Sequence, residues 1–239
     1  MGLLFLPLFL AGASCQKDLS RAEQYVVSGI EAAKQGDLRK AEVHFTESIR
    51  LDPLLVEGYQ NRGRLYNERG EYERAIIDLT QAIAMNPKLA DSFLYRGFAY
   101  LKLERYEDAV ADYGDAIKLD PALVQAFTNR GFAYDALGKS ERAIQDFDES
   151  IRLDPNNALA YNNRGLAEFH LEDYEPAVRD FDQAIMLEPD YTLAHANRAR
   201  AYTMLGRDAD AQQDVDRSAE LGFERVVLQA VIEDLKSKR

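Results

Sequence analysis

The sequence contains no tryptophan, one cysteine and three histidines in 239 residues. With Cys15 as its single cysteine, the chain forms no internal disulfide and no metal site that needs two cysteine ligands. Basic side chains are fewer than acidic ones, 29 against 41, which leaves a net charge of −12. Because an acidic protein repels phosphate backbones, we do not expect nucleic acid as a partner. The content of 46% hydrophobic and 29% charged residues is typical of a globular protein.

The sequence also lacks the motifs that carry catalysis. It has no nucleophile with a matching base, no glycine-rich phosphate loop and no paired metal ligands. The histidines His44, His170 and His195 stand far apart in the chain. We therefore expect no catalytic residues, no metal and no cofactor. An enzymatic role for His170 is the alternative, and nothing in the sequence supports it.

Residues 1–15 differ from the rest of the chain. Leu3 to Leu10 is an apolar run, and no Lys or Arg occurs before Lys17. At about 1.5 Å per residue, a helix of this length is too short for the ~30 Å core of a bilayer. The run and the small residues after it resemble a signal peptide.

Three interpretations of this segment stay open. A bacterial lipoprotein signal implies cleavage before Cys15 and lipid on its thiol, although Gly12 stands where such signals carry Leu. Ordinary secretion implies cleavage after Ala13. An uncleaved start implies a cytoplasmic protein. The first two interpretations predict a location at the bacterial cell envelope, lipid-anchored, periplasmic or secreted.

Prolines recur every 34 residues, at Pro53, Pro87, Pro121, Pro155 and Pro189. The tripeptide Asn-Arg-Gly recurs in the same register at 61–63, 129–131 and 163–165. A fixed period of this length indicates an array of stacked structural repeats.

Each unit contains two helical stretches. In the third unit, Phe93, Gly97 and Tyr100 share one face of the first stretch, and Ala109, Tyr113 and Ala116 share one face of the second. Glycine inside a helix costs about 1 kcal/mol relative to alanine. We attribute its recurrence to close approach of the paired helix at its small alanine. The proline ends the second helix, since it disfavours helix in the residue before it.

This pattern resembles the tetratricopeptide repeat, a 34-residue helix–turn–helix unit. The resemblance implies an all-α fold, namely a right-handed superhelical solenoid with a C-terminal capping helix. The last segment fits such a cap, because Leu228, Val231, Ile232 and Leu235 follow the spacing of one helical face. The predicted divisions are a signal-type segment 1–15, repeats 22–55, 56–89, 90–123, 124–157 and 158–191, a degenerate sixth repeat 192–224, and the capping helix 225–239.

Charged residues recur at two places of the repeat. Arginine stands directly before the first-helix glycine, and aspartate follows sixteen residues later; the pairs are Arg62 and Asp78, Arg96 and Asp112, Arg130 and Asp146, Arg164 and Asp180, and Arg198 and Asp214. In the first repeat Ser28 and His44 replace both together. A buried arginine is tolerated when a carboxylate pairs with it. We therefore predict a structural Arg–Asp ladder; the alternative is an arginine stripe that binds anionic ligands.

A second recurrent set predicts a binding surface. The residue before the arginine is usually asparagine, and apolar residues lie near it at Leu94, Leu101 and Phe169 as well. The resemblance implies that asparagine at this place reaches the concave groove and hydrogen-bonds the backbone of a bound peptide. The candidate peptide-binding residues are Asn61, Tyr95, Phe98, Asn129, Phe132, Asn163, Leu166 and Asn197.

The sequence thus predicts a non-enzymatic adaptor that binds a peptide or a partner helix in its groove. We expect contact with a membrane only through an N-terminal lipid. A cytoplasmic adaptor or co-chaperone is one alternative. A scaffold that assembles with copies of itself is the other.

Overall fold

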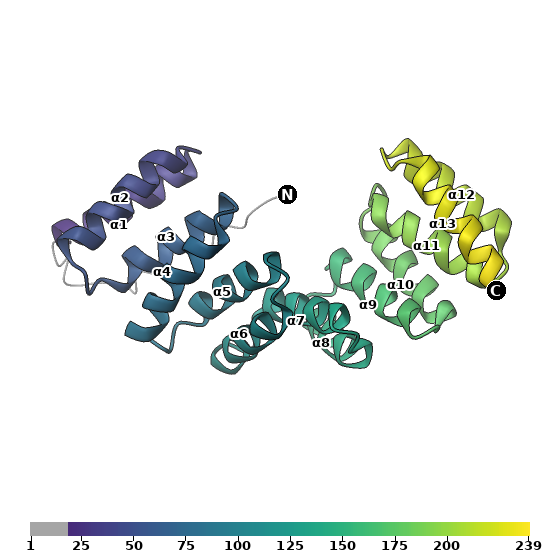
Figure 1. Cartoon of the computed structure of the whole chain (residues 1–239), viewed down its shortest axis with the longest axis horizontal. Coiled ribbons are helices and arrows are strands. Elements are labelled where there is room, and N and C mark those ends of the chain that lie inside the picture. The colour runs from purple at the N-terminus through teal and green to yellow at the C-terminus, as the bar shows by residue number, and fades with distance from the viewer. Residues whose placement is uncertain (1–18) are drawn as a thin grey trace.

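The computed structural model describes residues 19–239, which form thirteen α-helices and no strand (Figure 1). The expected all-α class is confirmed. The helices are α1 (Arg21–Lys34), α2 (Leu38–Leu51), α3 (Val56–Glu68), α4 (Tyr72–Met85), α5 (Ala90–Lys102), α6 (Tyr106–Leu119), α7 (Val124–Ala136), α8 (Ser140–Leu153), α9 (Ala158–His170), α10 (Tyr174–Leu187), α11 (Thr192–Met204), α12 (Asp208–Glu220) and α13 (Arg225–Lys238).

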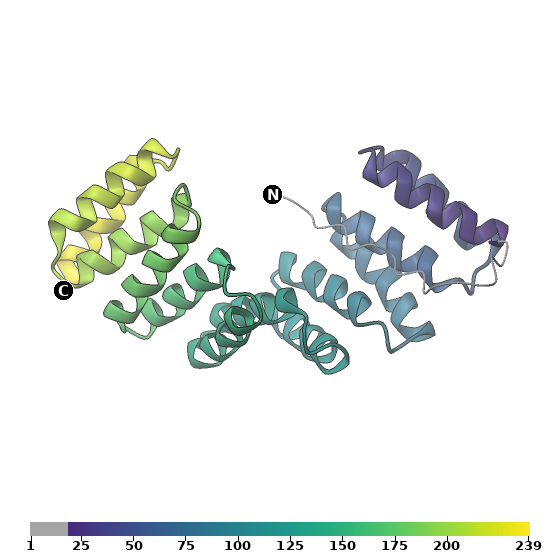
Figure 2. The same cartoon turned by 180° about the vertical axis from the view of Figure 1, so that it is seen from behind.

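The helices stack in chain order into an arch (Figures 1 and 2). Every helix packs on the next one along the chain. Successive odd-numbered helices also contact one another, whereas the even-numbered helices of residues 19–239 do not. The odd-numbered helices therefore crowd along the concave side, which we call the inner face, and the even-numbered helices form the outer face. The predicted solenoid is confirmed.

The turn inside each helix pair needs one residue in the left-handed region. Gly36, Gly70, Gly138 and Gly206 occupy it with φ between 70° and 80°. Glu104 and Glu172 take the same place in the third and fifth repeats, with φ of 58° and 64°. A side chain with a Cβ is strained by about 1 kcal/mol in this conformation. These two turns are therefore less favourable than the glycine turns.

The connection between pairs is built by the recurrent proline and the residue before it. The second helices end two residues before each proline, and in the first four repeats the residue between them has an extended backbone. Its side-chain oxygen accepts a hydrogen bond from the backbone N–H two residues later, at 2.9–3.1 Å, in Asp52, Asn86, Asp120 and Asp154. The short side chain and the proline together end the helix and start the turn to the next repeat.

The first-helix glycines make room for a large side chain of the second helix. A Cβ on Gly97 would lie 2.9 Å from the ring of Tyr113, and one on Gly131 would lie 2.8 Å from the ring of Phe147. Our attribution of these glycines to a small alanine opposite was incomplete. The backbone oxygens of Ala75 and Ala177 do lie close, at 3.4 Å from a Cβ on Gly63 and 3.0 Å from one on Gly165, but the large side chain one turn after the alanine comes nearer in every case.

The last helix, α13, packs on both α11 and α12. Leu228 and Ile232 are buried there, whereas Val231 is 38% exposed. Our placement of Val231 on the buried face was wrong, since the part of α13 that contacts α11 and α12 is narrower than the apolar face of this helix. The guanidinium of Arg239 fixes the end of α13, because it donates to the backbone oxygen of Thr203 and to Asp208 at 2.6–2.7 Å.

In residues 19–239, none of the helices combines the length and the hydropathy needed to cross a membrane. The predicted signal-type segment 1–15 and the candidate lipidation residue Cys15 lie outside the described residues.

Candidate functional site

The structure brings each arginine of the Arg–Asp ladder against the aspartate sixteen residues later. In all five pairs the guanidinium Nε and Nη2 donate to the two carboxylate oxygens at 2.7–2.9 Å. The aspartates are only 3–5% exposed. Two parallel charge-assisted bonds satisfy a carboxylate that would otherwise be very costly to bury.

Four of these arginines also reach back to the previous repeat. Nη1 donates to the side chain sixteen residues earlier at 2.6–3.1 Å, in the pairs Arg62–Thr46, Arg96–Thr80, Arg164–Asp148 and Arg198–Asp182. Arg130 has Gly114 at that place, where an added Cβ would lie 3.7 Å from Nη1. The ladder therefore joins neighbouring repeats except between the third and the fourth. Sequence reasoning missed this second partner, although its spacing is as regular as that of the first.

The electrostatics agree with a structural role for the ladder. The hydrogen bonds that Arg62, Arg96 and Arg130 donate to their aspartates raise the pKa of each guanidinium above its usual value, against the opposing effect of burial. In four repeats the guanidinium also lies 5.7–5.9 Å from a tyrosine ring of its own helix; these rings are Tyr66, Tyr100, Tyr134 and Tyr202. With Nε and Nη2 of every ladder arginine directed at an aspartate, these arginines are not a free stripe for anionic ligands.

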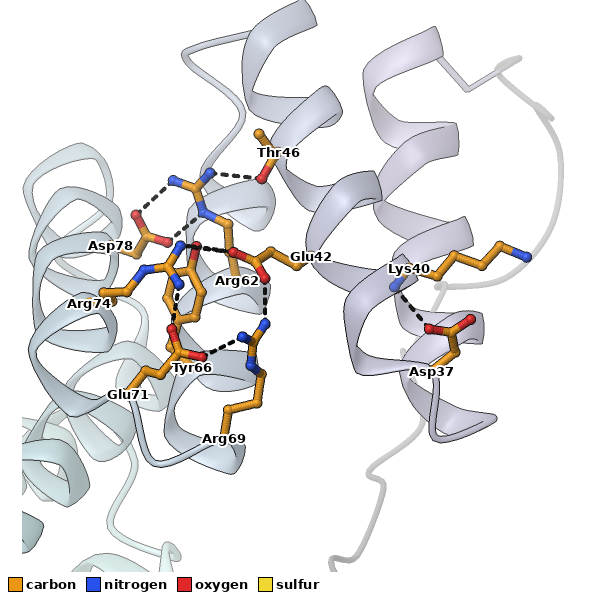
Figure 3. Close-up of polar contacts among 10 residues, drawn as sticks. All are labelled: Asp37, Lys40, Glu42, Thr46, Arg62, Tyr66, Arg69, Glu71, Arg74 and Asp78. Atoms are coloured by element: carbon orange, nitrogen blue, oxygen red, sulfur yellow. Dashed lines mark hydrogen bonds and ion pairs between the residues drawn. The ribbon is translucent and has the colours of Figure 1, made fainter.

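A second polar cluster joins the first two repeats (Figure 3). Glu42 on α2 accepts hydrogen bonds from Arg69, Arg74 and Tyr66, and both arginines also pair with Glu71. Burial alone raises the pKa of Glu42, but these three hydrogen bonds outweigh it and leave the pKa below its usual value. The next four repeats carry Ile or Val at this place, so repeat comparison gave a signal that our sequence reasoning did not use.

Glu168 lies inside the fifth repeat, at the place where four other repeats carry tyrosine. Its Oε2 atom is buried without a hydrogen-bond partner. Burial, assisted by the charges of Asp180 and Asp148, raises the pKa of Glu168 to about 7, while Arg164 and Arg179 act in the opposite direction. The charged form of Glu168 therefore destabilises the fold, and Glu168 changes its charge state near neutral pH.

The predicted asparagines lie half-buried on the first helices, and most already make internal hydrogen bonds. Asn61 donates to the backbone oxygen of Glu57 at 2.8 Å. In the last repeats the amides form a chain, because Asn162 donates to Asn163 at 3.1 Å and accepts from Asn197 at 3.1 Å. Asn129 lies half-buried in the same register on α7. These internal hydrogen bonds orient the side-chain amides of Asn61, Asn163 and Asn197 before a peptide binds.

The predicted apolar residues divide into exposed and buried ones. Phe132 is 45% exposed on the inner face, and Leu166 is half-buried beside it in register. Phe98 is half-buried, with Tyr72 edge-on at 6.4 Å and Lys102 over its ring. Tyr95 packs in the core around Tyr66 and Leu79.

Leu94 was expected on the groove surface, but it is 5% exposed and belongs to the core of the third repeat. The exposed apolar surface of the inner face is therefore smaller in its middle than predicted.

His170, the one histidine that we considered for catalysis, lies on α9 with Nδ1 3.0 Å from Asp135. Ser140 donates to the same carboxylate at 2.7 Å. Because the serine hydroxyl is directed at the aspartate and not at the imidazole, this group does not activate a nucleophile. Within residues 19–239, no three His, Cys, Asp or Glu side chains are grouped as a metal ion would require.

Family models match most of this architecture. A model described as TPR repeat matches residues 63–104 and 99–138. Models described as tetratricopeptide repeat match residues 44–77, 124–157 and 158–191. Together these matches span more than half of the chain. The comparison with curated proteins found no match.

Solved structures share the fold. The crystal structure of MamA is 25% identical, with a TM-score of 0.64 over 67% of this chain and 94% of that one. A tetratricopeptide repeat protein from Parabacteroides merdae is 22% identical, with a TM-score of 0.70 over 90% and 98%. YrrB, described as a TPR protein with an unusual peptide-binding site, is 24% identical, with a TM-score of 0.64 over 72% and 89%.

The ladder predicts a specific pattern of stability losses. Arg130→Leu leaves Asp146 buried without its partner, so we expect a loss of about 3–5 kcal/mol in the free energy of unfolding. Adding Asp146→Ala removes the stranded charge and is expected to recover part of this loss. Urea unfolding measures both variants. The control Arg152→Leu, which breaks an exposed pair with Glu149, is expected to change stability by less than about 0.5 kcal/mol. Losses that simply add in the double variant would contradict a coupled pair.

Glu168 predicts a pH dependence of stability. Its pKa is about 7 in the folded chain against a reference value of 4.5, so the folded state holds this proton more tightly. Proton binding by Glu168 therefore favours the folded state fully below about pH 4.5, and this contribution to the free energy of unfolding is lost as the pH rises towards 7. Glu168→Gln, which imitates the neutral acid, is expected to exceed wild type by about 1 kcal/mol at pH 8 and to match it at pH 4. Thermal unfolding with exposed Glu31→Gln as control measures this, and an equal difference at both pH values would refute it.

Proposed function

Because the chain belongs to the tetratricopeptide-repeat family, we propose that it is a non-enzymatic adaptor that binds a peptide or a helix of another protein along its inner face. The observation that carries this proposal is the exposed apolar surface of the odd-numbered helices, which includes Phe132, Leu159 and Leu193. Large apolar side chains exposed together on a concave surface are typical of a protein interaction site.

The inner face is also well suited to hold a polypeptide without large rearrangement. Its helices are joined by the Arg–Asp ladder, so the surface is largely ordered before the partner arrives. Binding to a preorganised surface avoids part of the entropy cost of ordering an interface. The half-buried amides of Asn129 and Asn163 offer donors and acceptors that read a peptide backbone independently of its sequence.

The comparison with YrrB supports the same interpretation. YrrB is described as having a peptide-binding site, and its fold is similar to this one over 72% of the chain. We extend peptide binding to the present chain as a proposal. The rival role is a scaffold in which the inner face packs on another copy of the chain.

We also propose that the protein acts at the bacterial cell envelope. The support is the apolar run 3–10, followed by small residues and Cys15. Cys15→Ser is expected to shift the protein from the membrane fraction to the soluble fraction, because a lipid anchor on the thiol is then lost. Cell fractionation with mass spectrometry of the mature N-terminus measures this. A full-length, unmodified N-terminus in the cytoplasm would contradict the proposal.

The groove is tested by a pull-down from envelope extract with the full chain as bait. Asn129→Ala/Phe132→Ala/Asn163→Ala removes two amides and one exposed ring, so we expect it to lose the bound partner. The control Gln145→Ala/Arg152→Ala changes exposed residues of α8 on the outer face and is expected to retain it. Quantitative mass spectrometry compares the three baits. A partner captured equally by all would exclude the groove, and a sedimentation coefficient that rises with concentration in purified wild type would favour self-assembly.

A further inference from the structure

The C-terminal end of the inner face contains a cavity of about 240 Å³ between α11 and α13. Its walls are mostly apolar, and its polar side chains are an amide and a guanidinium; the principal residues are Leu193, Phe223, Val227, Val231, Asn197 and Arg200. The volume exceeds the ~150 Å³ of an apolar protein cavity that holds benzene. It is therefore large enough for one aliphatic or aromatic side chain.

Arg200 differs from the arginines of the Arg–Asp ladder. Its Nη1 donates to the amide oxygen of Asn197 at 3.2 Å, and its guanidinium lies 4.7 Å from the centre of the Phe169 ring. Its Nε is buried without a hydrogen-bond partner. Among the described residues no carboxylate pairs with it, and burial alone lowers its pKa. A cation left without a counter-charge in a largely apolar pocket is stabilised when a ligand supplies a carboxylate.

Neighbouring amides hold Arg200 in place. Asn197 receives its Nη1 hydrogen bond and in turn donates to Asn162, which is buried on α9. The guanidinium is thus fixed between an amide and an aromatic ring before any ligand binds. This limits the side-chain entropy that Arg200 loses on binding an anion.

The apolar surface extends from the cavity across three helices. Leu159, Leu193 and Val227 stand 34 residues apart on α9, α11 and α13, and they are 47%, 51% and 49% exposed. The same place in the second, third and fourth repeats carries Glu57, Asp91 and Gln125. The inner face is therefore polar at this place in its N-terminal part and apolar at its C-terminal end.

We propose that this cavity binds an acidic–apolar segment of the partner polypeptide, in which an aliphatic or aromatic side chain enters between α11 and α13 and a neighbouring Asp or Glu accepts hydrogen bonds from Arg200. This inference rests on the proposed function, since it names the chemistry of the partner that the inner face binds. This kind of peptide is supported by its complementarity to the cavity. The unpaired Arg200 matches the carboxylate of the peptide, and the apolar opening beside Arg200 matches the neighbouring apolar side chain.

The experiment is a selection of random twelve-residue peptides, displayed without a free C-terminus, on the full chain. Wild type is expected to enrich peptides with Asp or Glu next to Leu, Ile or Phe. Arg200→Gln removes the charge but keeps a donor to Asn197, and it is expected to lose the acidic preference. Arg200→Glu is expected to favour Lys or Arg instead. Arg64→Gln changes the same place of the second repeat, away from the cavity, and serves as the matched control.

The best peptide is then synthesised with an amidated C-terminus and measured by fluorescence anisotropy. We expect binding to weaken about tenfold or more with Arg200→Gln, or when the Asp or Glu of the peptide is replaced by its amide, and to be unchanged with Arg64→Gln. Circular dichroism checks that each variant is folded. Loss of binding on amidation alone would assign the carboxylate to a chain terminus and refute the side-chain assignment.

Two outcomes separate this inference from the proposed function. Peptides that depend on Asn129 and Phe132 but show no acidic preference would overturn the Arg200 cavity and leave the adaptor role intact. If the Arg200→Gln variant still enriches peptides with Asp or Glu, the Arg200 cavity is likewise overturned and the adaptor role is left intact. If wild type enriches no peptide at all, the proposed peptide-binding function fails together with this inference.

Discussion

The bidentate pair between an arginine of one helix and a buried aspartate of the next is the interaction on which this solenoid depends. Each repeat of such an array touches only its neighbours, so stiffness has to be created at every junction. The pair fixes the two helices of a repeat, and the third nitrogen of the same guanidinium binds the preceding repeat at four junctions. One side chain thus sets both the geometry within a repeat and the angle between repeats.

This arrangement has a consequence for the inner face. Because the ladder arginines are held by their own aspartates, the surface available to a partner is formed by other residues of the odd-numbered helices, among them amides, carboxylates, exposed apolar residues and Arg200. The surface changes along the arch, from Glu57 and Asp91 near the beginning to Leu193 and Val227 near the end. The repeats share one backbone scaffold but do not offer one uniform binding surface. A partner therefore has a preferred position along the arch.

Much of the fold followed from the 34-residue period. The proline spacing predicted stacked repeats, the resemblance to the tetratricopeptide repeat implied an all-α solenoid, and both the class and the fold are confirmed. The joint replacement of Arg and Asp in the first repeat pointed to a pair, and the structure places five such pairs together. The period did not show which side chains meet between the helices of a repeat, because this depends on tertiary packing. The first-helix glycines accommodate large side chains such as Tyr113 in addition to the alanines, and Leu94 is buried in the core.

Other features were not predicted from the sequence because they break the repeat. The Glu42 cluster, the buried Glu168 and the unpaired Arg200 each occur in a single repeat, and a consensus pattern averages such residues away. The exposure of Val231 depends on how narrowly α13 meets α11 and α12, which helical periodicity does not encode. The candidate peptide-binding residues remain a prediction. The structure adds that Asn61, Asn163 and Asn197 have internal partners and that Tyr95 packs in the core, while Phe132 is exposed.

The regular spacing of the ladder also bears on how arrays of this kind change length. Every ladder arginine finds one partner sixteen residues ahead and, at four junctions, another sixteen residues behind, so both contacts survive when a whole unit is copied or removed in register. Excision of 90–123 would bring Thr80 to the place that Gly114 now occupies before Arg130, and would give that guanidinium the neighbour it lacks. Duplication and loss of entire units are thereby easier to accommodate than an insertion or deletion of a few residues, which would change the spacing of the charge pairs that lie on either side of it.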